Sequence, residues 1–211
     1  MHGRPGVCTA RTDRTRDTGG VATEKGERRR ALLVGAAADL LRTGGFEAVR
    51  HRAVAEKAGL PLASTTYYFA SLDDLVTAAA ERTCRDELDE VRADLEALPR
   101  DGPPSALVEL VLDQLLGPDS RSAGLDAVLL RYERLVATGR RPFLAPLMRA
   151  TRTEFDALLL AILGRAGYQL GAAALQRLVA VVDGTVVNSL IEADPDPRAA
   201  ARAALLAELT T

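Results

Sequence analysis

A short stretch of the chain, residues 48–75, carries side chains suited to contact with a polyanion. Arg50, His51 and Arg52 follow one another, and a run of hydroxyl and tyrosine side chains begins at Ser64. Guanidinium groups pair with phosphates, and they also bind guanine O6 and N7 in a bidentate way. Hydroxyl groups can donate to phosphates. This combination favours contact with nucleic acid, with Arg52 as the best candidate for reading a base.

The run that follows the arginines fits one short helix with an inward and an outward side. Thr65 and Phe69 stand four residues apart, so they are expected on the same, inward side. The outward candidates for DNA contact are Leu62, Ala63, Ser64, Thr66, Tyr67 and Tyr68. The apolar groups and tyrosine rings suit thymine methyl groups, whereas the hydroxyls suit phosphates. An alternative stays open, in which Tyr-Tyr-Phe is core and Ser-Thr-Thr is only a helix cap.

Two short helices joined by a tight turn are expected to position these side chains. The first runs from about Arg50 to Ala58, and Gly59 supplies the turn because it lacks a β-carbon. Pro61 suits the entry to the second helix, since its fixed φ is helical. This layout is typical of a helix-turn-helix, whose second helix lies in the DNA major groove.

Helical patterns continue through the rest of the chain. A first helix is expected from Lys25 to Gly44-Gly45, and a long one from Leu72 to Leu98, with Ser71 as its N-cap. Separated by Gly and Pro breakers, further helices are expected near 104–116, 122–138, 142–166, 170–193 and 197–209. No segment shows the alternation of a strand, so the expected fold class is all-α.

Charge is distributed unevenly along the chain. Residues 1–57 hold 12 Lys and Arg against 7 Asp and Glu, whereas the remaining residues hold 15 against 22, for a net charge of −2. A basic end on an acidic body suits local binding to phosphate. The tail at residues 1–23 is expected to be disordered, and its arginines either add DNA contacts or have no role.

Other classes of function find little support in the sequence. The two histidines, His2 and His51, complete no catalytic set, and Cys8 and Cys84 match no metal or disulfide spacing. We therefore expect no catalytic residues, no metal site and no cofactor. No window has the roughly 18 apolar residues of a membrane helix, and the N-terminus lacks an apolar signal region. The chain is expected to be cytoplasmic.

The order of these elements resembles that of the TetR family of bacterial transcriptional regulators. Matching positions are Gly45-Phe46, Ala58-Gly59-Leu60 at the turn, Phe69, and the segment from Ser71 to Leu75. Three positions depart from the family pattern, since its usual Tyr falls on Thr66, its frequent His on Tyr68, and a phosphate-binding Lys on Leu72. The resemblance therefore carries DNA contacts over most securely to Arg52, Ser64 and Tyr67.

The resemblance implies two domains. Residues 24–71 would form a three-helix DNA-binding domain, and residues 72–211 a helical domain for ligand binding and dimerisation. Two long apolar stripes near the C-terminus independently suit a helical hairpin, although either stripe could instead serve the chain's own core. The expected dimer-interface residues are Phe155, Leu158, Leu159, Ile162, Leu178, Val179, Val182 and Val186.

A ligand pocket is expected among the helices that follow the DNA-binding domain. Its candidate residues, each alternatively a surface or structural residue, are Gln114, Tyr132, Glu133, Phe155, Asp183 and Asn188. The resemblance implies a homodimeric repressor that binds a palindromic DNA operator and is released by a small molecule of unknown identity. The alternative is a helical ligand-binding or scaffold protein with a vestigial helix-turn-helix.

Overall fold

The computed structural model describes residues 19–99 and 103–210, and every regular element among them is helical. The helices are α1 (Gly19–Ala48), α2 (His51–Ala58), α3 (Leu62–Tyr68), α4 (Leu72–Ala97), α5 (Pro104–Leu116), α6 (Gly124–Ala137), α7 (Ala145–Arg165), α8 (Ala172–Ile191) and α9 (Pro197–Leu209). Three 3-10 turns join them, namely η1 (Pro118–Arg121), η2 (Thr138–Arg140) and η3 (Pro142–Leu144). The all-α expectation is confirmed.

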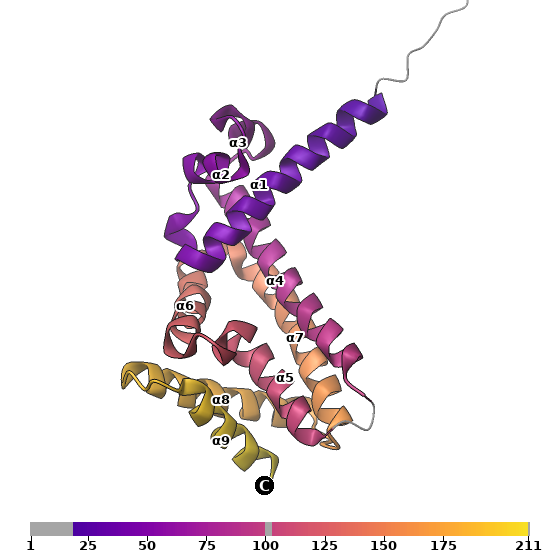
Figure 1. Ribbon diagram of the computed structural model, residues 1–211, viewed down its shortest axis with the longest axis vertical. Helices are drawn as coiled ribbons and strands as arrows, with labels where there is room; N and C mark the ends of the chain where they lie inside the picture. The colour runs from indigo at the N-terminus through magenta and orange to yellow at the C-terminus, as the bar shows by residue number, and fades with distance from the viewer. Residues whose placement is uncertain (1–18, 100–102, 211) are drawn as a thin grey trace, which may run out of the picture.

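Helices α1, α2 and α3 form one end of the molecule (Figure 1). α1 bends at Gly45, whose φ of 66° is a left-handed conformation that glycine adopts without a steric penalty. Gly59 ends α2 in the same region, with a φ of 64°, and its N–H donates to the carbonyls of Ala55 and Glu56. The sharp turn that follows sets α3 against α2.

The start of α1 corrects one expectation. The disordered tail was expected to reach residue 23, but α1 already begins at Gly19. Residues 1–18, which carry the arginines of the expected tail, lie outside the described residues. The expected helix end at Gly44-Gly45 is confirmed as a break in the helix, because Gly45 has non-helical φ and ψ, and a further short helical stretch then runs to Ala48.

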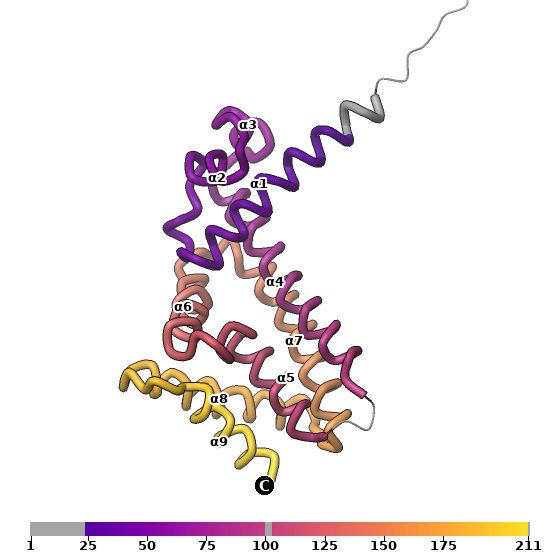
Figure 2. Tube along the Cα trace, in the orientation of Figure 1, coloured from indigo at the N-terminus to yellow at the C-terminus, as the bar shows by residue number. Residues whose placement is uncertain are grey.

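Helix α4 runs from the end formed by α1, α2 and α3 into the body, beside α7 (Figure 2). Ser71 caps it as expected, since its hydroxyl accepts a hydrogen bond from the Asp74 N–H at 3.1 Å. The first half of α4 contributes to an N-terminal core and the second half to a C-terminal core. Leu72, where a lysine is usual in the family, is partly buried against the N-terminal core and so contributes packing.

The N-terminal core gathers side chains from the segment of α1 to α4 and from η3, just before α7. It consists of Leu33, Ala36, Ala37, Leu41, Phe46, Val49, Val54, Phe69, Leu75, Val76, Ala79, Ala80 and Leu144. Because Leu75, Val76 and Leu144 belong to it, the packing crosses the domain boundary expected at residue 71. That boundary stays a prediction.

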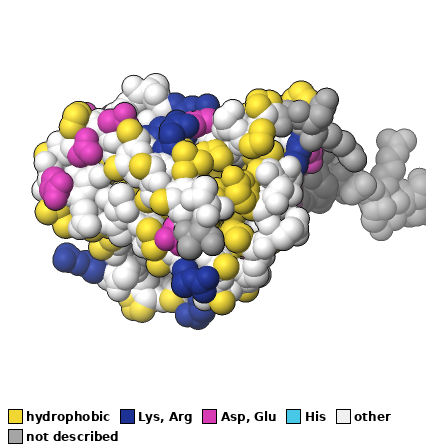
Figure 3. Space-filling model, turned by 90° about the horizontal axis from the view of Figure 1, so that it is seen from below, with side chains coloured by type: hydrophobic (Ala, Val, Ile, Leu, Met, Phe, Trp, Pro, Cys, Tyr) yellow, Lys and Arg dark blue, Asp and Glu magenta, His cyan; other side chains and the backbone are white. Residues whose placement is uncertain are grey.

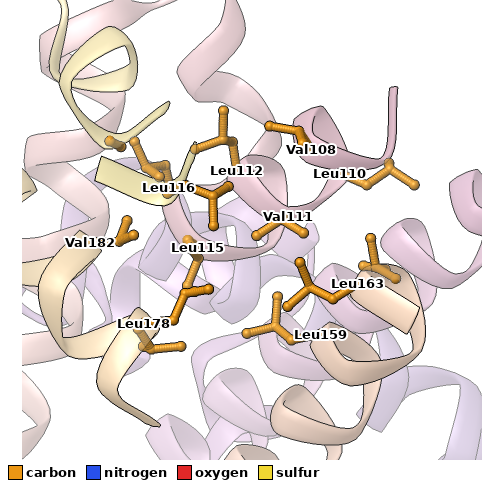
Figure 4. Close-up of a cluster of buried hydrophobic side chains, with 14 of the residues drawn as sticks. Val108, Leu110, Val111, Leu112, Leu115, Leu116, Leu159, Leu163, Leu178 and Val182 are labelled. Carbon is orange, nitrogen blue, oxygen red and sulfur yellow. The ribbon is translucent and has the colours of Figure 1, made fainter. Parts of the chain in front are cut away.

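Helix α5 is the centre of the C-terminal core. Leu112, Leu115 and Leu116 of α5 meet Leu159 and Leu163 of α7, and Leu178 and Val182 of α8 (Figure 4). From Leu110 to Leu116 every residue of α5 is buried. Such all-round burial is expected for a helix that is apolar on all sides. It also takes two polar residues, Asp113 and Gln114, into the interior.

The side chains expected at the dimer interface lie inside this same core. The seven buried ones are Leu158, Leu159, Ile162, Leu178, Val179, Val182 and Val186, and Phe155 is partly buried against them. This placement corrects the expectation. The apolar periodicity identified the inward side of α7 and α8, and that side packs against the chain's own helices.

Helix α8 is apolar on its outer face as well. Val181, Val187 and Ile191 are 42%, 41% and 77% exposed, and Gly184 lies between them with open space beyond its α-carbon. We call Ala180, Val181, Gly184, Val187 and Ile191 the outer face of α8. Seen from the side where α8 and α9 lie, hydrophobic side chains gather between scattered charged ones (Figure 3).

By length and composition alone, α8 is also the single helix among the described residues that could cross a membrane. Its inner side chains, including Leu178, Val182 and Val186, are buried in the C-terminal core. The core helix of a soluble protein passes the same test, and burial in the C-terminal core accounts for the apolar inner side of α8.

Candidate DNA-binding surface and internal cavity

Helix α3 presents its polar side to solvent in the way the sequence predicts. Thr65 and Phe69 are 0% and 4% exposed, whereas Tyr67 is 81% exposed. The Thr65 hydroxyl donates to the Leu62 carbonyl at 2.8 Å, which anchors the inward side of the helix. Leu62, Ala63 and Thr66 are exposed, and Ser64 and Tyr68 are partly exposed. An aromatic ring as large and as exposed as that of Tyr67 is suited to contact with a binding partner.

Tyr67 and Tyr68 differ in their surroundings although they are neighbours. Their rings meet edge to face, with centroids 4.9 Å apart. Tyr68 packs against the N-terminal core, and its hydroxyl lies beside Gly26 of α1. Tyr68 therefore ties α3 to α1, and Tyr67 is the freer of the two for contact with DNA.

The three basic residues at the start of α2 also have different roles. Arg52 is exposed and makes no ion pair with any described residue. Arg50 pairs with Glu47, and Glu47 also binds Arg141 at 3.2 Å. The Nδ1 atom of His51 is buried without a hydrogen-bond partner among the described residues. Among these three, Arg52 alone is unengaged and open to solvent.

Helix α1 brings further basic residues next to α3. Lys25 and Arg29 line a shallow groove together with Ser64, Tyr67 and Tyr68. Sequence reasoning did not single out Lys25 or Arg29 as contacts, because it treated the basic stretch only as part of a charge surplus. Cations beside a groove-reading helix suit phosphate contacts that fix its orientation.

A cavity of about 190 Å³ lies inside the body, bounded by α4, α5, α6, α7 and α8. Leu88, Val91, Leu135, Phe155 and Val179 supply apolar wall. The polar groups on its wall are Cys84, Glu87, Asp113, Gln114, Arg131, Thr151, Arg152 and Asp183. A mostly apolar cavity with a few placed polar groups is typical of a small-molecule site.

A second cavity, of about 180 Å³, lies between this one and α1. Its wall includes Asp39 and Arg42 of α1, so it sits where the DNA-binding helices meet the body. Glu87 and Arg131 line both cavities. Glu87 and Arg131 therefore lie in the wall that separates the internal cavity from the second cavity, next to α1.

Comparison with known proteins agrees with this arrangement. The family model described as "Tetracyclin repressor-like, C-terminal domain" matches residues 102–211, which is more than half of the chain. The chain belongs to the TetR family. Members of this family are DNA-binding regulators rather than enzymes, and none of the curated proteins matches the chain.

Solved structures give the same assignment over most of the chain. The multidrug binding protein EbrR, complexed with ethidium, is 32% identical, with a TM-score of 0.60, covering 86% of this chain and 98% of its own. The same protein complexed with imidazole is also 32% identical, with a TM-score of 0.59 and coverage of 86% and 90%. A transcriptional regulator from Streptomyces coelicolor A3(2) is 25% identical, with a TM-score of 0.59 and coverage of 87% and 99%.

The pocket residues expected in this TetR-family regulator divide into three groups. Gln114, Phe155 and Asp183 line the internal cavity. Tyr132 is buried behind Asp183 and donates its hydroxyl to Asp183 Oδ1 at 2.7 Å. Glu133 and Asn188 are exposed and do not line this cavity. Sequence reasoning missed Glu87 and Arg131, because charged side chains on amphipathic helices are usually solvent-facing.

Glu87 is held in its charged form by two arginines. Its carboxylate accepts hydrogen bonds from Arg131 at 2.7 Å and from Arg134 at 2.5 Å. Burial alone would raise the pKa of Glu87, but the two guanidinium groups hold it below the usual value of 4.5. Arg131 also donates to the carbonyls of Gln114 and Leu115, both at 3.1 Å, which fixes α6 against the end of α5.

Glu87→Gln is expected to destabilise the TetR-family regulator by about 2 kcal/mol at neutral pH, because two mostly buried guanidinium groups lose their counter-charge. Because the native pKa of Glu87 is lowered, its ionised form stabilises the fold above the unfolded-state pKa. That stabilisation is lost as the pH falls through the native pKa. The difference between wild type and variant should therefore be full at neutral pH and shrink as the pH falls below 4.5.

Urea unfolding across this pH range measures the difference. Glu81→Gln, on the exposed side of the same helix, removes an equivalent charge from a surface pair with Arg85 and should cost under about 1 kcal/mol. Equal losses for the two variants would contradict the role given to Glu87.

Proposed function

We propose that this TetR-family protein is a homodimeric repressor that binds a palindromic DNA operator and leaves it when a small organic molecule enters the internal cavity. The observation that carries the proposal is the exposed side of α3, where Tyr67 is 81% exposed in a groove that Lys25 and Arg29 of α1 also line. Family membership supports the general features of the proposal, since TetR-family regulators bind operators, dimerise and respond to effectors.

The proposed DNA contacts are Arg52, Ser64 and Tyr67, with Lys25 and Arg29 added as phosphate contacts. Arg50, His51, Leu62, Ala63, Thr66 and Tyr68 stay in the wider predicted set. Arg52 suits a base edge, whereas the hydroxyl and ammonium groups suit the backbone. Leu72 replaces a family lysine, so the first turn of α4 contributes no cation here.

The proposed dimer surface is the outer face of α8. Val181, Val187 and Ile191 are apolar yet exposed on this face, whereas the chain itself covers the inner face of α8, so a second copy could cover the outer one. Val187 and Ile191 also line an open cleft with Leu129 and Val136 of α6, which extends the apolar surface. A twofold axis through this surface would place two α3 helices on half-sites about 34 Å, or a multiple of that, apart.

The proposed effector site is the cavity bounded by α4 to α8. EbrR, which shares about a third of its residues with the chain, is described as a multidrug binding protein and is seen with proflavin and with ethidium. For this chain we propose a small organic effector, whose binding moves α4 and alters the separation of the two α3 helices. TetR-family regulators are soluble cytoplasmic proteins, which suits an effector that enters the cell.

Arg52→Ala and Tyr67→Ala are each expected to lower operator affinity about tenfold or more, because each removes a contact to the groove. Operators are first obtained by selecting bound fragments of genomic DNA, and affinity is then measured by fluorescence anisotropy at several salt concentrations. Arg82→Ala is the matched control, since Arg82 is exposed on α4 and pairs only with Asp86 of the same helix.

Three outcomes are distinguishable. Salt-dependent binding that is weakened by Arg52→Ala and Tyr67→Ala, but not by Arg82→Ala, supports the repressor. DNA binding that is unchanged by both Arg52→Ala and Tyr67→Ala favours the alternative of a ligand-binding protein with a vestigial helix-turn-helix. The same alternative is favoured if the selection yields no bound genomic fragment. Loss of affinity in all three variants alike would indicate nonspecific charge effects and would also contradict the assigned contacts.

A further inference from the structure

Asp183 is the carboxylate of the internal cavity that lacks an ion pair among the described residues. It lies on α8 and lines the cavity with Val179, one turn away. Its Oδ1 atom accepts the Tyr132 hydroxyl at 2.7 Å. Burial and then the charge of Asp183 raise the pKa of Tyr132, so the phenol keeps its proton and holds the carboxylate in place.

The other two carboxylates on the cavity wall are already neutralised. Glu87 is bound by Arg131 and Arg134. Asp113 is bound by Arg121 and, at 2.9 Å, by Arg198. Asp183 therefore lines the cavity with one hydrogen bond and no ion-pair partner among the described residues, so a cation that enters the cavity can supply its counter-charge.

The two cations on the wall are also engaged. Arg131 donates to Glu87 and to the carbonyls of Gln114 and Leu115. Arg152 pairs with Asp156 at 2.7 Å, and its guanidinium lies 5.5 Å from the centroid of the Phe155 ring. Because that ring already holds a cation, the site for a ligand's charge in this cavity is Asp183 and not the Phe155 ring.

We propose that the effector of this protein is an organic cation whose positive centre binds the free oxygen of Asp183, while its apolar part lies against Leu88, Val91 and Phe155. The inference rests on the proposed function, because it names the chemical class of the effector for that same cavity. Asp183 sets the charge preference of the cavity, and Tyr132 positions it. A neutral molecule of the same shape would make the same apolar contacts as the cation but no ion pair with Asp183, so it should bind more weakly.

Two probes of nearly equal size that differ in charge test this preference. N-methylquinolinium is a permanent cation, and 4-methylquinoline has the same ring system and the same number of non-hydrogen atoms and is uncharged in mildly alkaline buffer. Titration calorimetry on the full chain without DNA should show that wild type binds the cation about tenfold more tightly than the neutral probe, the change expected for one partly desolvated ion pair. Asp183→Asn should abolish this difference by weakening only the cation, because the amide oxygen can still accept the Tyr132 hydroxyl.

Glu133→Gln is the matched control, because Glu133 follows Tyr132 on α6 but is exposed and lies outside the cavity. It should keep the wild-type preference for the cation. The proposal is overturned if wild type binds the two probes equally, if neither probe binds, or if Asp183→Asn keeps the preference. Operator binding by Asp183→Asn in the absence of probe is measured in parallel, so loss of cation selectivity is separable from failure of the repressor assignment.

Discussion

Val187→Glu is expected to convert the protein to a monomer and to lower operator affinity by about 100-fold or more. Val187 lies on the outer face of α8, 41% exposed, one turn from Gly184, which has open space beyond its α-carbon. A carboxylate there would be buried without a partner if a second copy packed against this face. Losing the dimer leaves one α3 per molecule, and linking two binding modules raises affinity by factors on the order of 10²–10⁴.

Light scattering after size-exclusion chromatography gives the mass, and fluorescence anisotropy gives the operator affinity. Ala93→Glu adds the same charge to an exposed position of α4, away from α8, and should leave both quantities unchanged. Far-ultraviolet circular dichroism should report equal helix content for the two variants. A dimeric Val187→Glu protein with normal operator affinity would show that the second copy packs elsewhere.

Arg198→Ala is expected to lower the free energy of unfolding by about 3 kcal/mol or more, the scale measured when one partner of a buried ion pair is removed. Arg198 is 7% exposed at the start of α9. It donates to the Ser120 hydroxyl at 2.6 Å and to Glu109 at 2.7 Å, and its guanidinium lies 2.9 Å from Asp113. Without it, Asp113 and Glu109 keep only their more exposed partners.

Urea unfolding at a fixed protein concentration measures this loss, because the proposed dimer would make the apparent stability depend on concentration. Arg92→Ala is the comparison, since Arg92 bridges Asp89 and Glu154 on the exposed side of α4 and α7. Surface pairs of this kind are worth under about 1 kcal/mol. If the two variants unfold at the same urea concentration, the buried network does not stabilise the fold as described.

The helices and their ends were predictable because the signals for them are local. Apolar spacing gave the helices, and the Ser71 cap, the Gly59 turn and the inward placement of Thr65 and Phe69 each depend on a few neighbouring residues. Such features are set by backbone geometry and by the period of the helix. The structure places them as the sequence indicated.

The partners of an apolar stripe were not predictable from its spacing. Leu178 and Val182 show the same periodicity whether they face the chain's own core or a second copy, and the structure places them in the core. The buried ion pairs of Glu87 and Arg198 were not predicted from the sequence for a related reason. Their partners come from helices distant in sequence, so nothing in the local pattern distinguishes them from solvated charges.

Helix α4 belongs to both cores without interruption. It gives Leu75 and Val76 to the N-terminal core, and Leu88 and Val91 to the C-terminal core. Because a loss of packing in one core would release part of a helix on which the other depends, we expect the two halves to unfold together. Damage deep in the body therefore removes DNA recognition by melting the recognition unit itself, with no change at any residue that contacts DNA.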